Sequence, residues 1–325
     1  MTVKFGFAGF RHAHIFSLYN RVRETPETEV IAAWEADADA RQAAVSQGVS
    51  FNCDTLDELL NTPGLDVVAV SGAYGDRAAV VLKALEAGKH VISDKPFCIT
   101  LAELEQIEKT VSEKKSVLGC MFDLRTAPNF YTAQQLIRSG EIGEVCAIQF
   151  NGMHPLNYGI RPAWYFEKNM HGGTINDIAI HLFDLLPGLT GSGVKRIISA
   201  KSGNLNFPQE PHFSNTGVLM LELENGACVS GDVSYFAQNF NDPAYWRLSV
   251  WGTVGQLEFN YNTPGVRLTA RGESRELPPS SAPADYFDAF LGELAGTPAT
   301  PCTQEILKTA RWALSAQQTA DHQQR

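Results

Sequence analysis

The sequence predicts an α/β protein with two domains: a doubly wound parallel sheet at the N-terminal side, then an α+β domain built on a large, open, mostly antiparallel sheet. The chain has 325 residues, which is longer than a single hydrophobic core usually supports, so two domains are expected. Up to residue 122, short apolar runs alternate with helical patterns of about a dozen residues, which is typical of βαβ units. Residues 123–325 contain consecutive strand patterns joined by short turns, which favours antiparallel pairing.

Composition restricts the classes of function. The formal net charge is -10, and the chain has no block of Lys and Arg residues. Both features argue against a nucleic acid or a membrane as partner. The N-terminus lacks the pattern of a signal peptide and no apolar run is long enough to span a bilayer, so we expect a cytoplasmic protein. The six cysteines show no Cys-x-x-Cys spacing, which argues against a zinc knuckle or a disulfide scaffold. A small-molecule substrate is the expected partner.

The first domain is predicted to contain five strands separated by helices. Two of the helices open with the capping-box patterns Thr55-x-x-Glu58 and Thr100-x-x-Glu103, and a third stops at Gly88. The predicted strands cover residues 3–8, 30–34, 66–70, 90–93 and 117–120.

A glycine turn follows the first strand and precedes a helix, the arrangement that directs backbone N–H groups at a pyrophosphate. The dinucleotide motif G-x-G-x-x-G is incomplete here, because Arg11 stands at the second glycine position and His14 at the third when Gly9 is the first. Arg11 must therefore either point away from the phosphates or contribute its guanidinium to them.

Glu35 ends the second predicted strand. An acid at this position accepts hydrogen bonds from a ribose diol and repels a 2′-phosphate, so NAD is favoured over NADP. Arg41 nearby keeps NADP as the alternative, and Glu35 could instead simply open the next helix.

The fourth strand ends in Asp94-Lys95-Pro96. Open α/β sheets bind their ligands at the carboxyl ends of the strands, so Lys95 is expected at a ligand site. A lone lysine in a loop is the alternative. The predicted cofactor-binding residues are Gly9, Phe10, Arg11, His12, Glu35, Ser71, Asp94, Lys95 and Pro96.

In the second domain one helix (residues 127–139) precedes a series of strands, and two helices close the chain and are expected to pack back on the body. We expect the uncovered face of the sheet to mediate a homodimer or homotetramer. The predicted strands cover residues 145–151, 194–202, 218–224, 227–235, 245–252, 255–260 and 266–270.

A second polar constellation lies in this domain. Asp177 and His181 follow the pair Gly172-Gly173 at helical spacing, so they share one face, as a general base and its orienting carboxylate require. A histidine satisfied within the core is the alternative. A zinc site of His171, Asp177 and His181 is disfavoured, because the ligands lack tight spacing; no metal is expected.

Together these motifs resemble the glucose-fructose oxidoreductase / inositol dehydrogenase (Gfo/Idh/MocA) family. The similarity covers nearly the whole chain, with Asp94 where the family usually has Glu, and Arg77 where many relatives carry His. The motifs are the Gly9 turn, Glu35, residues 87–91 followed by Asp94-Lys95-Pro96, residues 137–143, and Gly172-Gly173 through Asp177 to His181.

The resemblance implies an NAD(P)-dependent dehydrogenase acting on a hydroxyl of a sugar, polyol or related metabolite. It implies that Lys95 binds the substrate oxygen, His181 is the general base and Asp177 assists it. A lyase or glycoside-cleaving enzyme that borrows and returns hydride, and a non-catalytic NAD-sensing regulator, are the alternatives. The expected substrate-binding residues are Lys95, Arg125, His154, Arg161, Trp164, Asp177 and His181.

Overall fold

The computed structural model describes residues 2–322 and divides into two compact units. Unit 1 holds the chain up to Met121 together with Asn169–Gly172 and Tyr286–Leu307. Unit 2 holds Phe122–Lys168, Gly173–Asp285 and the chain from Lys308 onward. The division falls within the last helix, α9 (Thr303–His322), so this helix contributes residues to both units.

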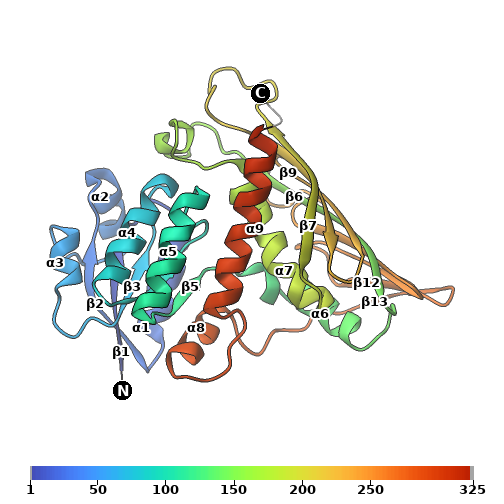
Figure 1. The fold of residues 1–325 in the computed structure, drawn as a ribbon, viewed down its shortest axis with the longest axis horizontal. Coiled ribbons are helices and arrows are strands. Elements are labelled where there is room, and N and C mark those ends of the chain that lie inside the picture. Colours follow the sequence, from blue (N-terminus) through green and yellow to red (C-terminus); the bar gives the residue numbers. More distant parts are fainter. Residues whose placement is uncertain (1, 323–325) are drawn as a thin grey trace. The chain divides into compact units, whose positions relative to one another are not determined.

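Unit 1 is built on a five-stranded sheet in which all neighbouring strands are parallel, which confirms the predicted doubly wound fold (Figure 1). The strand order is β2-β1-β3-β4-β5, with β1 (Val3–Ala8), β2 (Thr28–Trp34), β3 (Val67–Val70), β4 (His90–Ser93) and β5 (Leu118–Cys120). The helices of this unit include α1 (His14–Glu24), α2 (Ala38–Ser46), α3 (Leu56–Leu60), α4 (Tyr74–Glu86) and α5 (Leu101–Lys114).

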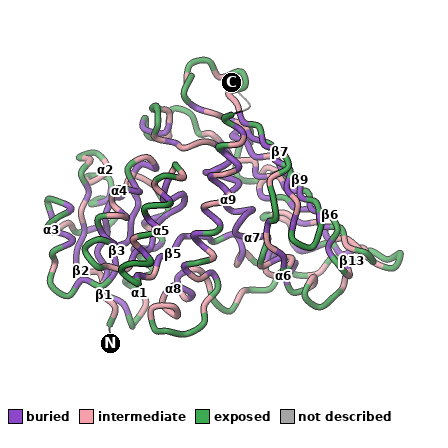
Figure 2. The backbone as a smooth tube through the Cα atoms, viewed as in Figure 1, coloured by how far each residue is buried: buried purple, intermediate pink, exposed green. Residues whose placement is uncertain are grey.

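Helix α8 (Tyr286–Leu294) joins the core of unit 1, although it is distant in sequence. Phe287 and Phe290 pack against Phe5 of β1, with ring centroids 5.9 and 6.5 Å apart. A Cβ at Gly119 would lie 2.6 Å from Phe290, so only glycine gives this ring room against β5. The central strands of the sheet are buried (Figure 2).

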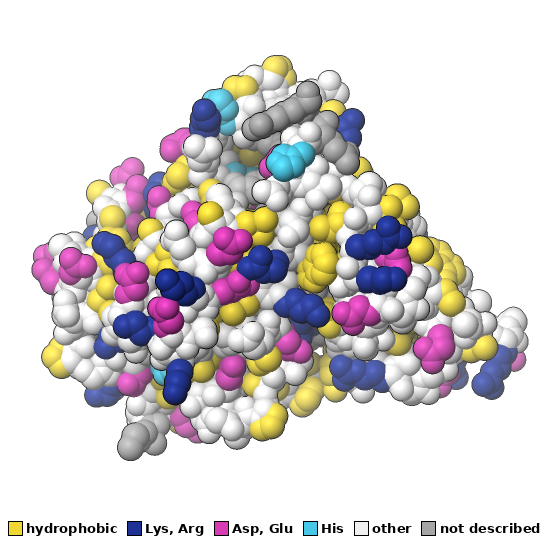
Figure 3. Space-filling view, viewed as in Figure 1, with side chains coloured by type: hydrophobic (Ala, Val, Ile, Leu, Met, Phe, Trp, Pro, Cys, Tyr) yellow, Lys and Arg dark blue, Asp and Glu magenta, His cyan; other side chains and the backbone are white. Residues whose placement is uncertain are grey.

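The predicted helix starts follow from side-chain caps. Thr100 accepts a hydrogen bond from the backbone N–H of Glu103, whose carboxylate accepts one from Thr100 N–H, a complete capping box for α5. Thr55 caps α3 in the same way through Glu58 N–H. On the face of the molecule over α4 and α5, acidic and basic side chains are interspersed (Figure 3).

Unit 2 is built on an eight-stranded sheet, which confirms the predicted large and mostly antiparallel sheet. Its order is β13-β12-β11-β10-β6-β9-β8-β7, with β6 (Val145–Pro155), β7 (Val194–Gly203), β8 (Thr216–Leu223), β9 (Cys228–Ala237), β10 (Arg247–Gly252), β11 (Gly255–Phe259), β12 (Val266–Ala270) and β13 (Glu273–Leu277).

Two features of this sheet differ from the sequence expectation. β6 and β9, which are separated in the chain by β7 and β8, pair in parallel. β13 was not predicted, because its residues Glu273–Leu277 are mostly exposed and polar and show no apolar alternation.

One face of the sheet packs against α6 (Pro128–Arg138), α7 (Ile180–Thr190) and the π-helical turn Ile175–Ala179 that precedes α7. The other face exposes apolar side chains, among them Val218, Met220 and Trp251, and its role in self-association stays a prediction. Among residues 2–322, no helix combines the length and apolar character that crossing a membrane requires.

Candidate active site

Four of the predicted cofactor-binding residues follow directly or closely on the carboxyl ends of parallel strands in unit 1. Gly9 follows β1, Glu35 follows β2, Ser71 follows β3 and Asp94 follows β4. Because all these strands are parallel, their carboxyl ends meet at one edge of the sheet, where open α/β proteins bind ligands. The structure thus brings these predicted residues together within one unit.

The turn after β1 requires glycine at its first position. Gly9 has a φ of +94°, and a Cβ there would lie 2.6 Å from the Ser71 carbonyl oxygen. The same carbonyl accepts a hydrogen bond from Arg11 N–H at 3.3 Å. The ends of β1 and β3 therefore approach closely without the second and third glycines of the usual motif.

Glu35 is buried and braces this turn. One carboxylate oxygen accepts a hydrogen bond from Phe10 N–H at 2.5 Å, and the other accepts one from Asp37 N–H at 2.8 Å. Burial raises the pKa of the Glu35 carboxyl, and the two backbone hydrogen bonds oppose that rise. The Arg11 guanidinium lies 3.9 Å from the Asp37 carboxylate and 3.6 Å from that of Asp76.

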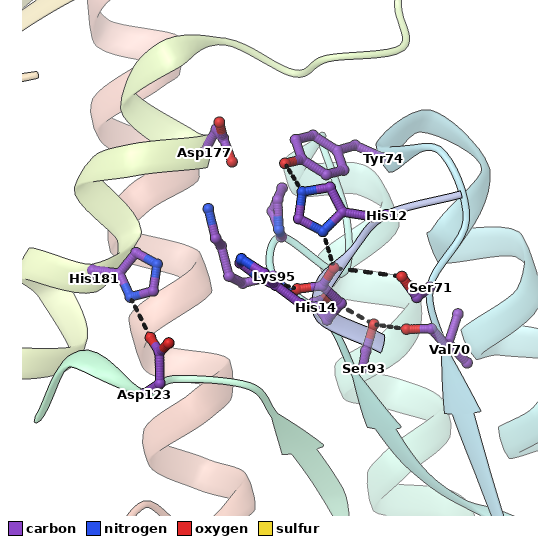
Figure 4. Close-up of polar contacts among 12 residues, drawn as sticks. His12, His14, Val70, Ser71, Tyr74, Ser93, Lys95, Asp123, Asp177 and His181 are labelled. Atoms are coloured by element: carbon purple, nitrogen blue, oxygen red, sulfur yellow. Dashed lines mark hydrogen bonds and ion pairs between the residues drawn. The ribbon is translucent and has the colours of Figure 1, made fainter. Parts of the chain in front are cut away.

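The buried Asp94 is the centre of a polar cluster, which we call the Asp94 cluster and define as Asp94, His12, His14 and Arg77. Arg77 is also buried, His12 is half-buried and His14 is exposed; Figure 4 shows the two histidines. Its carboxylate lies 2.6 Å from His12 Nδ1, 3.1 Å from His14 Nδ1 and 2.9 Å from the Arg77 guanidinium. Burial alone would raise the pKa of Asp94, but Arg77 and the two imidazoles hold it well below its usual range. Burial lowers the pKa of His12 to about 4 despite the neighbouring carboxylate.

Lys95 is buried directly after this carboxylate. Its N–H donates to Asp94 Oδ1 at 2.8 Å, and its carbonyl accepts from Arg77 Nη1 at 2.7 Å. Arg77 also donates to the Pro96 carbonyl at 3.1 Å, and the Lys95–Pro96 peptide bond is cis. Asp94 and Arg77 thus fix the backbone that carries the Lys95 side chain.

In unit 2, Asp177 lies within the π-helical turn, and two tyrosine hydroxyls contact its carboxylate. Tyr165 donates to Asp177 Oδ2 at 2.9 Å, and Tyr235 from β9 donates to the same oxygen. The two hydroxyls are 3.0 Å apart. π-Helical turns within helices are frequent at functional sites. The predicted four-residue spacing of Asp177 and His181 therefore spans a π-helical turn and the start of α7.

His181 is buried in α7 with its Nδ1 atom 4.0 Å from the carboxylate of Asp123 (Figure 4). Its ring lies edge-on to Trp246, with centroids 4.9 Å apart, and to Phe122 at 6.1 Å. At 4.0 Å this contact is electrostatic and not a hydrogen bond, and the negative charge on the Nδ1 side of the ring favours a proton on that atom, which leaves Nε2 able to accept one.

The glycine pair before this segment is required by close packing. Gly173 has a φ of +91°, and a Cβ there would lie 2.2 Å from the Gln317 side chain of α9. Gln317 accepts a hydrogen bond from Ile175 N–H at 3.0 Å, at the beginning of the π-helical turn. Gly173 therefore allows a close approach to α9 within unit 2.

The other predicted substrate contacts have partners inside unit 2. Arg125 forms a buried bidentate ion pair with Asp184, with contacts of 2.9 and 2.6 Å. The Arg161 guanidinium stacks 4.3 Å from the Tyr165 ring centroid. Trp164 is buried, and the His154 ring lies 4.7 Å from that of Trp246. Their roles toward a substrate stay predictions.

Three features were not predicted from the sequence: the positions of Asp123 and Tyr235 in the site, and the contact of His14 with Asp94. Asp123 carried a usable signal, because it follows closely on β5, the same kind of position that pointed to Asp94. Tyr235 carried none, because an aromatic residue in a strand is ordinary core material.

The fold and these groups define a dinucleotide-binding protein with a separate second sheet. Residues 3–122 match the family described as "Oxidoreductase family, NAD-binding Rossmann fold", and residues 130–258 match the "GFO/IDH/MocA C-terminal domain". The chain therefore belongs to the GFO/IDH/MocA family of oxidoreductases, which confirms the resemblance seen in its motifs.

Among similar proteins is levoglucosan dehydrogenase from Pseudarthrobacter phenanthrenivorans, 28% identical over 73% of this chain and 65% of that protein. Another is the scyllo-inositol 2-dehydrogenase (NAD(+)) of Bacillus subtilis, 25% identical over 89% of this chain and 82% of that protein. A solved structure of an oxidoreductase from Erwinia carotovora atroseptica has a TM-score of 0.88 at 26% identity, covering 98% of this chain and 99% of that one.

Proposed function

We propose that this protein is an NAD-dependent dehydrogenase that oxidises a secondary or anomeric hydroxyl of a sugar, polyol or related metabolite. The observation that carries the proposal is Lys95, a buried lysine whose backbone is held by Asp94 and Arg77 at the strand-end edge of the sheet, in a domain from an NAD-binding family. The names of the related levoglucosan and scyllo-inositol dehydrogenases support the substrate class.

The residues have separate tasks in this reaction. NAD, when bound, would supply the acceptor for the hydride that leaves the carbon carrying the hydroxyl. His181 takes the hydroxyl proton on Nε2, because Asp123 lies on the Nδ1 side and stabilises the imidazolium that forms. The Lys95 ammonium stabilises the negative charge that develops on the oxygen as its proton leaves. Asp177, held by two tyrosines, orients a substrate hydroxyl or relays the proton.

The proposal is tested by mixing the purified chain with NAD and a panel of polyols and sugars that includes levoglucosan, scyllo-inositol and xylose, and following NADH fluorescence. Lys95→Ala is expected to lower kcat by about 100- to 1,000-fold on the active substrate while NAD still binds, because it removes the charge that stabilises the oxyanion. Lys89→Ala is the control: it removes a lysine just before β4 whose ammonium contacts the Leu65 carbonyl instead.

Full activity of the Lys95→Ala variant would contradict the assignment. A product that forms without net NADH would point to a lyase that returns its hydride. No turnover anywhere in a broad panel, with NAD bound, would favour a regulatory protein.

We propose NAD rather than NADP as the cofactor. Glu35 and Asp37 place two carboxyl groups at the end of β2, and Asp37 also draws the Arg11 guanidinium toward itself. Both effects disfavour a 2′-phosphate. We expect kcat/KM to be at least about tenfold higher with NAD than with NADP.

The matched variants are Asp37→Ser and Asp39→Ser. Serine keeps the capping hydrogen bond that Asp37 accepts from Ala40 N–H but removes the charge, so Asp37→Ser should reduce the preference for NAD by about threefold to tenfold. Asp39→Ser removes an exposed charge in the same helix turn and should leave the preference unchanged. Equal use of both cofactors by the unmodified protein would contradict the proposal.

A further inference from the structure

We propose that His12, His14 and Asp94 form a binding site for a divalent transition-metal ion of the Zn²⁺ class. One potential ligand atom from each residue lies within 4.8 Å of the other two. Among residues 2–322, no other group of three His, Cys, Asp or Glu side chains meets this condition. The site is contained entirely in unit 1, and it does not depend on the proposed dehydrogenase activity.

These ligands come together because two of them are neighbours in the sequence and the third lies at the end of a nearby strand. His12 and His14 are separated by one residue in the turn that leads from β1 into α1, and their rings lie 4.5 Å apart. Asp94 comes from the end of β4, which meets this turn because β1, β3 and β4 are adjacent parallel strands. In the glycine-rich version of the turn no side chain would occupy the His14 position, so this chain adds a ligand where a typical dinucleotide motif has none.

The donor atoms suit a metal ion of intermediate softness. Two imidazoles and one carboxylate are ligands that Zn²⁺, Co²⁺ and Ni²⁺ accept, whereas Mg²⁺ and Ca²⁺ prefer sites made of oxygen. Ligation requires an ionised carboxylate and neutral imidazoles.

The surrounding contacts fit the roles of groups that orient metal ligands. The Tyr74 hydroxyl lies 3.3 Å from His12 Nε2, where it can accept the proton that a histidine ligating through Nδ1 carries on its other nitrogen. Arg77 binds Asp94 Oδ2 at 2.9 Å, and Oδ1, which also accepts the Lys95 N–H at 2.8 Å, lies 3.1 Å from His14 Nδ1. Tetrahedral ligands about 2.0 Å from zinc lie about 3.3 Å apart, close to this separation.

Two features limit the affinity. The ion replaces the protons that the imidazoles share with Asp94, and the buried Arg77 charge repels it. We therefore expect a dissociation constant on the order of micromolar, weaker than that of structural zinc sites, with one or more positions left for water.

The test uses the full chain without a histidine tag, stripped with EDTA. Calorimetric titration with ZnCl₂ is expected to show one equivalent bound, and Co²⁺ should give visible d–d absorption of a four- or five-coordinate site. His14→Ala and His12→Ala should each weaken Zn²⁺ binding at least tenfold and abolish the Co²⁺ bands. The His14 side chain is 45% exposed, so its truncation should spare the fold, which an unchanged melting temperature checks.

The matched control is His322→Ala, which removes an exposed histidine at the end of α9 and should bind Zn²⁺ like the unmodified chain. The proposal is overturned if the stripped protein shows no saturable Zn²⁺ binding, or if both cluster variants bind the ion as tightly as the control. Either result would identify the three residues as a hydrogen-bonded cluster only.

Discussion

His181→Ala is expected to lower kcat by about 100- to 10,000-fold, the range that a positioned general base contributes. His181 is buried in α7 and its Nδ1 side faces Asp123, and alanine at this position has no group that accepts a proton. NAD affinity should stay unchanged, because the NAD-binding match ends at residue 122. Steady-state kinetics on the substrate found by the panel and a fluorescence titration with NAD measure the two quantities.

A matched control is His212→Ala, which removes an exposed histidine of unit 2. Asp123→Asn gives a second readout: it should lower kcat less than His181→Ala does, since it keeps the base and removes only the charge that stabilises the imidazolium. If His181→Ala retained the kcat of the His212→Ala protein, the assignment of the general base would be wrong.

Asp94→Asn is expected to lower the free energy of unfolding by about 3–5 kcal/mol at neutral pH. The substitution leaves the Arg77 guanidinium, which is fully buried, without its counter-ion. Urea denaturation of the two proteins measures the difference. Asp76→Asn is the control, because its ion pair with Arg11 is exposed and such pairs contribute about 0–1 kcal/mol.

The pH dependence of this difference has a definite sign. The folded-state pKa of Asp94 lies below its unfolded value of about 3.9, so the ionised carboxylate contributes its full stabilisation above that value. The stabilisation is lost as the pH falls through the folded-state pKa. The gap between Asp94→Asn and the unmodified chain should therefore be constant from neutral pH to about pH 5 and shrink only in more acidic solution. A difference below about 1 kcal/mol at neutral pH would contradict the role of the Asp94 cluster.

The local sequence pattern was sufficient to predict a helix or strand where one or both of its faces are buried. The five strands of unit 1 were predictable because parallel strands covered on both sides are continuous apolar runs that end at turn residues. β13 was not predictable, because it lies at the edge of its sheet and its exposed residues, such as Glu273 and Arg275, form no apolar pattern. The parallel pairing of β6 with β9 was also beyond local pattern, since the order of strands in a sheet depends on contacts between distant segments.

Periodicity and turn residues act over a few neighbouring positions, so they were enough to predict the class of fold, the Gly9 turn, and the strand-end positions of Glu35, Asp94 and Lys95. The contacts of those side chains depend on the folded arrangement. The Asp94 carboxylate contacts His12, His14 and Arg77 from different elements, and Asp177 accepts hydrogen bonds from Tyr165 in a short 3-10 helix (Ala163–Phe166) and from Tyr235 in β9. Burial forces each of these charged or polar groups to find partners, and the identity of the partners is set by which distant segments the fold brings together.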